Sequence, residues 1–238
     1  MARYEFSIII PVLREAARIN SIIEHIYSRG FSEGFEIIVV DGSPDGETIS
    51  AISRKEVKSI VSERGRAAQM NAGAAIASGE ILIFLHADTR LPGNALQKIR
   101  AVMEQKRYVA GAFDLGIDSA RLAFRIISFG ANLRSHLNRI PYGDQAIFVR
   151  KDHFHSIGGY RKIPLMEDVE LMRRLKKRGD KICILPDRVR TSPRRWEKEG
   201  IICCTLRNWV ISTLYFMGVS PHKLIRYYRS DRNGRKNR

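Results

Sequence analysis

Cysteine is scarce in this chain of 238 residues, which contains three. Cys183, Cys203 and Cys204 match no metal-binding spacing, and adjacent cysteines rarely bridge each other. So few thiols exclude a disulfide framework and favour a reducing compartment. We therefore expect a cytoplasmic protein.

Glycine-rich phosphate loops are also missing. Neither Gly-x-x-x-x-Gly-Lys-Ser/Thr nor Gly-x-Gly-x-x-Gly occurs, which disfavours a P-loop ATPase and a dinucleotide-dependent dehydrogenase. Residues 41–52 open in the way that a calcium loop does, but Ile52 stands where the bidentate glutamate belongs. A calcium site is therefore not expected.

The chain has no uninterrupted apolar run of membrane-spanning length. It begins directly with a strand-like run, without the charged, apolar and cleavage segments of a signal peptide, so none is expected. Residues 201–219 are apolar, but Arg207 and Asn208 lie at their middle. A central arginine costs about 2.5–3.5 kcal/mol on membrane insertion. We expect an amphipathic helix that either lies on a membrane or packs on the protein's own core.

Positive charge is abundant and unevenly distributed. Of the formal net charge of +16, residues 171–238 carry +14, from 19 Lys or Arg and 5 Asp or Glu. A basic end on a nearly neutral body indicates an anionic partner, although solubility alone is an alternative explanation. No nucleic-acid motif with interleaved aromatic residues is present, so nucleic acid is not expected. We expect a phosphorylated or lipid-linked substrate, or peripheral binding to an anionic membrane at its inner face.

Hydrophobic periodicity and turn residues predict alternating strands and helices. Together they indicate an α/β fold with a mostly parallel sheet flanked by helices, ending in a C-terminal amphipathic helix. We expect one domain over residues 1–199, and an amphipathic helix with a basic, partly disordered tail over residues 200–238. The expected strands are 6–12, 37–40, 59–61, 81–85, 108–117, 145–149 and 181–185, and the expected helices are 15–27, 64–78, 92–106, 122–137, 167–178 and 201–219.

Acidic residues stand at the ends of several of these elements. Asp41 and Asp88 follow buried strands, and Glu167 with Asp168 opens a helix. Ligands of open parallel sheets bind beyond the carboxyl ends of the strands. Hard divalent cations take carboxylate ligands and leave positions for phosphate oxygens. Asp88 is thus a candidate metal ligand, and His86 a second ligand or a ribose contact.

These positions are part of a longer pattern. From about Phe6 to Trp196, the chain resembles the family 2 glycosyltransferases, and within them a compact bacterial branch sometimes labelled arsenosugar-biosynthesis glycosyltransferases. The resemblance implies a GT-A fold, a nucleotide-sugar donor, a divalent cation (Mn or Mg) and inversion at the anomeric carbon. It rests on Pro11 with Glu15, Asp41-Gly42-Ser43-Pro44-Asp45, the Arg-Gly-Arg-Ala-Ala-Gln-Met-Asn-Ala-Gly run at 64–73, His86-Ala87-Asp88, Gly143-Asp144-Gln145 and Glu167-Asp168.

The resemblance also implies roles for the donor side. Pro11 and Glu15 would line the nucleotide pocket, and Asp41 would hydrogen-bond the base. Arg66 would contact donor phosphates or base, with Asn71 fixing its loop.

Further roles follow for the reacting groups. Asp88 would bind the metal that bridges the phosphates, and Asp168 would be the catalytic base, with Glu167 orienting the site or contacting the acceptor. Asp144 is a candidate acceptor contact, with a turn role as the alternative. Arg195 and Trp196 resemble an Arg-Trp element beside the donor phosphates and acceptor, and both, like His86, are candidate donor-binding residues.

Two departures narrow the expected reaction. The family's usual Asp-x-Asp is His86-Ala87-Asp88, and Ser192 replaces the glutamine of the processive members' Gln-x-x-Arg-Trp. The first departure concerns the metal and ribose contacts. The second, together with the absence of an expected membrane-spanning helix, favours transfer of a single sugar over polymer synthesis. A nucleotidyltransferase on a related sheet is the alternative enzyme, although residues 11–15 lack its glycine-rich signature. A basic nucleic-acid-binding protein is the non-enzyme alternative.

Overall fold

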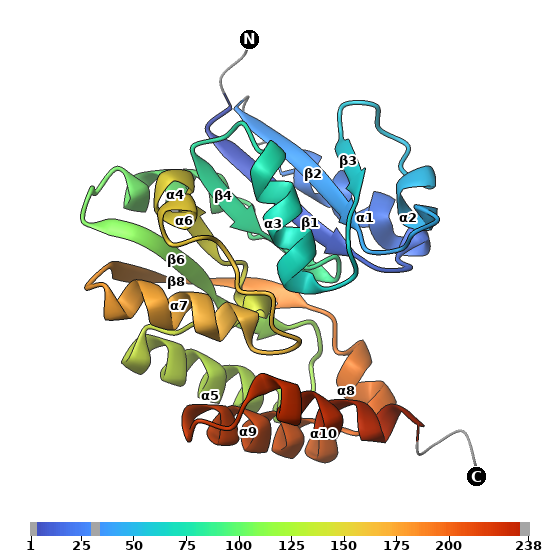
Figure 1. Cartoon of the computed structure of the whole chain (residues 1–238), viewed down its shortest axis with the longest axis vertical. Helices are drawn as coiled ribbons and strands as arrows, with labels where there is room; N and C mark the ends of the chain where they lie inside the picture. The colour runs from blue at the N-terminus through green and yellow to red at the C-terminus, as the bar shows by residue number, and fades with distance from the viewer. Residues whose placement is uncertain (1–3, 30–33, 234–238) are drawn as a thin grey trace.

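The computed structural model describes residues 4–29 and 34–233, and it forms an eight-stranded sheet in the order β3-β2-β1-β4-β7-β6-β8-β5. Helices cover both faces of this sheet (Figure 1). The strands are β1 Phe6–Val12, β2 Phe35–Asp41, β3 Lys58–Val61, β4 Ile81–Phe84, β5 Thr89–Arg90, β6 Tyr108–Ile117, β7 Phe148–Arg150 and β8 Lys181–Thr191. The helices are α1 Ala16–Tyr27, α2 Glu47–Ser50, α3 Arg66–Ile76, α4 Ala95–Met103, α5 Leu122–Asn138, the 3₁₀ turn η1 Gly143–Gln145, α6 Lys151–Ser156, α7 Glu167–Lys177, α8 Arg194–Glu199, α9 Ile201–Phe216 and α10 Pro221–Asn233.

The predicted α/β class with a mostly parallel sheet is confirmed. Strands β3, β2, β1 and β4 are parallel neighbours, and β6 is parallel to β8. Strand β7 runs antiparallel to both β4 and β6, and β5 runs antiparallel to β8. The carboxyl ends of β1, β2 and β4 therefore meet at one edge of the sheet.

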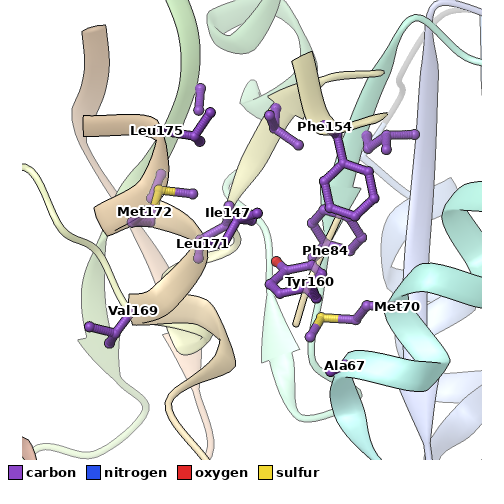
Figure 2. Close-up of a cluster of buried hydrophobic side chains, with 14 of the residues drawn as sticks. Ala67, Met70, Phe84, Ile147, Phe154, Tyr160, Val169, Leu171, Met172 and Leu175 are labelled. Carbon is purple, nitrogen blue, oxygen red and sulfur yellow. The ribbon is translucent and has the colours of Figure 1, made fainter. Parts of the chain in front are cut away.

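Two hydrophobic clusters cover the two faces of the sheet. Along β1, Ile9 belongs to one cluster, whereas Ile8 and Ile10 belong to the other, because successive side chains of a strand point to opposite faces. Burial on both faces explains why the central strands read as continuous apolar runs. Figure 2 shows the first cluster, in which α7 faces Phe84, Tyr160 and α3.

Several predicted boundaries were wrong because long-range contacts decide them. The strand expected at 145–149 begins at Phe148, since Gln145 is buried in η1 and its side chain bonds Ser135 and the Phe113 carbonyl. The strand expected at 181–185 continues to Thr191. Its pairing with β6 skips Pro186 and Asp187, a bulge that lets the ladder pass a proline. The short helices α2, α6 and α8 were not predicted. Gly30, the glycine expected to follow and close the helix predicted at 15–27, lies outside the described residues.

The C-terminal part is more ordered than predicted. The tail was expected to be disordered after Ser230, but helix α10 extends to Asn233. Residues 234–238 lie outside the described part of the chain. Helix α9 packs on the first cluster through Ile211 and Tyr215, and helix α10 does so through Leu224. Within residues 4–29 and 34–233, no helix has the length and apolar character needed to cross a membrane. The boundary at residue 199 stays a prediction.

Two helical glycines provide a matched test of this packing. A Cβ at Gly73 would lie 2.5 Å from Ile9 Cγ2 and 3.0 Å from Val40 Cγ2, whereas a Cβ at Gly130 would meet no heavy atom within 4 Å. We expect Gly73→Ala to lower the free energy of unfolding by about 1–3 kcal/mol through overpacking. Gly130→Ala should raise it by about 0.5–1 kcal/mol, because alanine loses less backbone entropy in a helix. Urea denaturation measures the free energy of unfolding of both variants. Equal changes in the two variants would contradict the close packing of α3 on β1 and β2.

Candidate active site

The loop after β2 is built around Asp41. This side chain is fully buried, and its Oδ1 accepts hydrogen bonds from the Ser43 amide at 2.8 Å and hydroxyl at 2.7 Å. Its Oδ2 accepts from the Thr48 amide at 3.0 Å. Both carboxylate oxygens are therefore engaged within the loop, so Asp41 sets the loop's shape. Contact with a nucleobase stays a prediction.

Gln69 fastens this loop to the first strand and was not predicted. Its buried Nε2 donates to the Val12 carbonyl at 2.6 Å and the Val40 carbonyl at 2.8 Å, so it joins the ends of β1 and β2. The amide packs closely on Gly42, where a Cβ would lie 3.0 Å from Gln69 Cδ. Its position within the 64–73 motif was the available signal. A buried amide that satisfies two strand-end carbonyls holds the edge of the sheet rigid.

Asn71, from the same helix, holds a more distant loop. Its Nδ2 donates to the Tyr160 carbonyl at 2.8 Å, and its Oδ1 accepts from the Tyr160 amide at 2.9 Å. This pair of bonds fixes the loop that leads toward α7, rather than the loop of Arg66 as expected. Pro11 lies beside Val40 in the pairing of β1 with β2, one residue before the carboxyl end of β1.

Glu15 and Asp88 are joined by an arginine that the sequence did not single out. Arg194 Nη2 lies 3.2 Å from Glu15 Oε1 and 3.7 Å from Asp88 Oδ2. Helix α8 thus directs Arg194 into the site.

The two predicted residues that follow it make other side-chain contacts, although the charge of Arg195 also acts on Asp88. The Arg195 guanidinium lies over the ring of Tyr228, 4.4 Å from its centre, and the Trp196 ring packs edge-on against Phe124. Their donor contacts stay predictions.

Asp168 lies at the start of α7 and is oriented by backbone amides. Its Oδ2 accepts a hydrogen bond from the Gly143 amide, and its Oδ1 accepts one from the Val169 amide at 2.7 Å. A Cβ on Gly143 would lie 3.2 Å from Asp168 Oδ2 and 3.1 Å from His86 Nε2. The imidazole at the end of β4 and the carboxylate of α7 therefore approach the same point. A side chain larger than that of glycine at position 143 would crowd both groups.

Arg66, the first residue of α3, is the positive charge shared by these acidic groups. Arg66 is an exposed residue at the start of this helix. Partial loss of hydration opposes its charge, but Glu167, followed by Tyr228, Asp168 and Asp88, outweighs that effect and raises the pKa of Arg66. Such a cation near the strand ends suits an anionic ligand.

The ionisable groups around Arg66 are strongly perturbed, mainly by burial. Burial, followed by the charge of Arg66, lowers the pKa of His86 to about 3, so the imidazole is neutral. Burial raises the pKa of Asp144 to about 6, although Arg134 opposes the shift. Burial, with the nearby Asp168, raises the pKa of Glu167 to about 7. Clustered shifts of this kind are typical of functional sites.

A metal ion has few protein ligands at this site. Over the residues that the structure describes, no three or more His, Cys, Asp or Glu side chains gather to hold one. Burial raises the pKa of Asp88, and a neighbouring cation would favour its charged form. Together with the neutral imidazole of His86, this carboxylate fits a divalent ion that takes its remaining ligands from phosphate oxygens. A cavity of about 350 Å³ adjoins Asp88, between α1 and β8.

Comparison with known proteins identifies relatives of this arrangement. The sequence profile of Glycosyl transferase family 2 matches residues 7–165, more than half of the chain. A mannosyltransferase, PcManGT from Pyrobaculum calidifontis, in complex with GDP-Man and Mn²⁺, is similar with a TM-score of 0.63 and 20% identity over 79% of this chain and 57% of that one. S. aureus TarS 1–349 in complex with UDP-GlcNAc has a TM-score of 0.60 and 18% identity over 79% of this chain and 58% of that one. A further structure of S. aureus TarS 1–349 has a TM-score of 0.60 and 17% identity over 86% of this chain and 66% of that one. The chain thus spans less than two thirds of these structures.

The raised pKa of Glu167 predicts a dependence of stability on pH. A carboxyl that ionises at about 7 when folded, against its ordinary 4.5, binds more protons in the folded state, so stability falls as pH rises between these values. We expect Glu167→Gln to match the unchanged protein near pH 4.5 and to exceed its stability at pH 8, by on the order of 2–3 kcal/mol.

Urea denaturation at the two pH values measures this difference. The exposed Glu56→Gln variant serves as the control and should follow the unchanged protein. Identical pH slopes for Glu167→Gln and the unchanged protein would contradict the assignment.

Proposed function

The chain belongs to glycosyl transferase family 2 and is a glycosyltransferase, and on this premise we propose that it transfers a single sugar from a nucleotide-sugar donor, with inversion and with the help of a divalent cation. Its fold is of the GT-A type. The observation that carries the proposal is the approach of His86, Asp168 and Gly143 to one point beside Arg66.

The donor would bind along the strand-end edge. Relatives of this fold were crystallised with GDP-Man or UDP-GlcNAc, which supports a nucleotide-sugar donor here without selecting base or sugar. We propose that Pro11 and Glu15 line the nucleotide pocket, and that Asp41 acts through the loop it shapes. Arg66 would neutralise donor phosphates, and Arg194 would add a second positive charge next to Asp88.

Asp168 is proposed as the base. As the acceptor oxygen forms its bond to the anomeric carbon, the carboxylate takes the hydroxyl proton, and the sugar–phosphate bond breaks with its electron pair on the nucleoside diphosphate. A single displacement of this kind inverts the anomeric carbon. The Gly143 and Val169 amides orient the carboxylate for this transfer. Glu167, which ionises at about 7, limits the negative charge beside it.

Asp88 would hold the divalent cation, Mn or Mg, with His86 as a second ligand or a ribose contact. When bound, the cation would neutralise charge that develops on the diphosphate leaving group. The presence of Mn²⁺ in the mannosyltransferase complex supports this part of the proposal. Asp88 and His86 stand on one short loop after β4, so both would act from the same fixed strand end.

The acceptor would lie on the Asp144 side of the site. Asp144 is half-buried and lies within the electrostatic influence of Asp168 and Arg66, which supports a contact with the acceptor hydroxyl or its neighbours. We propose a phosphorylated or lipid-linked acceptor and a peripheral position at an anionic membrane, on the basic end of the chain. The likeness to the arsenosugar-labelled branch carries no acceptor assignment.

Replacing the proposed base tests the reaction. We expect Asp168→Asn to lower kcat/KM for sugar transfer at least about 100-fold, because the amide cannot accept the proton, while donor binding persists. The control is Asp152→Asn, which changes an exposed carboxylate on α6 and should keep full activity. For each nucleotide sugar that is assayed, the released product should be identified. A glycosyltransferase releases a nucleoside diphosphate, whereas pyrophosphate would indicate a nucleotidyltransferase. Full transfer activity of the Asp168→Asn variant would contradict the assignment of Asp168 as the base.

Replacing the proposed metal ligand tests the cation. A thermal-shift panel of nucleoside diphosphates and nucleotide sugars, with and without Mn²⁺, should show a larger rise in Tm with the metal than without it. We expect Asp88→Asn to remove most of this metal-dependent increment. If the Asp88→Asn variant keeps the full metal-dependent rise in Tm, Asp88 is excluded as the metal ligand.

A further inference from the structure

Helix α5 is inverted in polarity. It buries the polar side chains of Ser128, Asn132 and Ser135, whereas five large apolar side chains are 48–75% exposed. Their spacing of four, three, four and four residues places them on one stripe, about 22 Å long at about 1.5 Å per residue. A helix that faces water has the opposite pattern. The exposed residues are Leu122, Ile126, Phe129, Leu133 and Leu137.

Helix α9 and the residue that follows it carry a second exposed stripe. Cys204, Ile211 and Tyr215 are buried on one side of the helix. The opposite side exposes large apolar groups to between 41% and 75%, among them Trp209 at 66%. The residues of this stripe are Ile202, Leu206, Trp209, Val210, Phe216 and Met217.

Tyr142 joins the two helices. Its ring lies under the Arg134 guanidinium of α5, 3.3 Å from Cζ to ring centre, and its hydroxyl hydrogen-bonds Ser212 of α9. Phe124 of α5 also packs against Trp196 of α8, which leads directly into α9. Figure 1 shows α5 and α9 on the same side of the molecule, away from β3 and α1. We call the two exposed stripes together the α5–α9 face.

The two segments that carry this face contain basic residues and no acidic ones. Neither residues 119–143 nor residues 200–230 contain Asp or Glu, and every Lys or Arg there adds positive charge. Arg121, Arg125 and Arg139 are exposed on or beside α5, and Lys223 and Arg226 are exposed on α10. Apolar stripes bordered by cations complement the head-group region of an anionic bilayer. A second copy would bring the same cations together across a two-fold interface, which disfavours a dimer through this face.

The geometry favours a helix that lies in the interface over one that spans the bilayer. At 16 residues α9 is about 24 Å long, short of the roughly 30 Å hydrocarbon core. Arg207, at its middle, is paired with Glu199 instead of facing outward with the apolar stripe. The helix can therefore bury its stripe without burying an unpaired charge.

We propose that the α5–α9 face docks on an anionic membrane, inserting both apolar stripes to the depth of the head groups. This inference assigns a surface to the peripheral membrane position proposed above, and it does not depend on the proposed sugar transfer, because these exposed apolar residues take no part in that reaction.

Vesicle flotation of the full chain tests the proposal. The protein should float with vesicles of phosphatidylcholine containing 30% phosphatidylglycerol, and much less with phosphatidylcholine alone. We expect Phe129→Ser with Leu133→Ser to lower the partition coefficient by on the order of tenfold or more, since two apolar groups no longer leave water. The matched control replaces two exposed apolar residues elsewhere, Val61→Ser with Ile76→Ser, and should float like the unchanged protein.

A second measurement uses the unchanged protein, so that a folding defect cannot decide the outcome. Emission of the exposed Trp209 should shift to the blue and be quenched by brominated lipid, and Trp209→Phe should float normally but lose most of the quenching. Absence of flotation, equal flotation of the α5 variant, or equal binding to neutral vesicles would overturn the proposal. A dimer that the α5 substitutions dissociate, without vesicle binding, would assign the face to a second copy. Donor-induced shifts in Tm, measured in parallel, should be unchanged by the α5 substitutions.

Discussion

The site depends on one electrostatic constraint, the gathering of several carboxyl groups around a single guanidinium. Asp88 follows β4 whereas Glu167 and Asp168 begin α7, and each raises the pKa of Arg66. Carboxylates crowded in a partly buried place either take up protons or need a cation. Both responses occur here, because Glu167 ionises only at about 7 while Arg66 stays charged. An anionic donor at this edge would compete with these carboxyl groups for Arg66, and a bound cation would ease that competition.

The seating of α3 determines where that guanidinium stands. Gly73 brings the helix so close to β1 and β2 that a Cβ would overlap Ile9. One turn earlier, Gln69 bonds to the carbonyls that end the same two strands. Arg66 begins the helix, so these contacts fix its backbone against the strand ends. The 64–73 motif therefore joins packing, strand capping and charge in one segment.

Much of this could be predicted from local sequence patterns. The central strands are continuous apolar runs, and Asp88 follows one of them, so its place at the edge of the sheet follows from topology. Arg194 could not be found in this way, because only the path of α8 decides which arginine of a pair turns toward Asp88. The bulge in β8 and the turn η1 depend on partners far away in the sequence.

The inverted polarity of α5 shows how the site and the outer surface constrain each other. The buried polar side of α5 serves the site, since Asn132 pairs with the backbone of Leu115 in β6 and Ser135 bonds Gln145. Gln145 in turn accepts from the Tyr142 amide, which fixes the turn whose Gly143 amide orients Asp168. A helix whose inward side is needed for hydrogen bonds gains little stability from apolar burial there. Its large apolar residues on the outward side add nothing to the folded monomer in water. Together with the exposed stripe of α9, on two segments without Asp or Glu, they provide what a membrane contact would require.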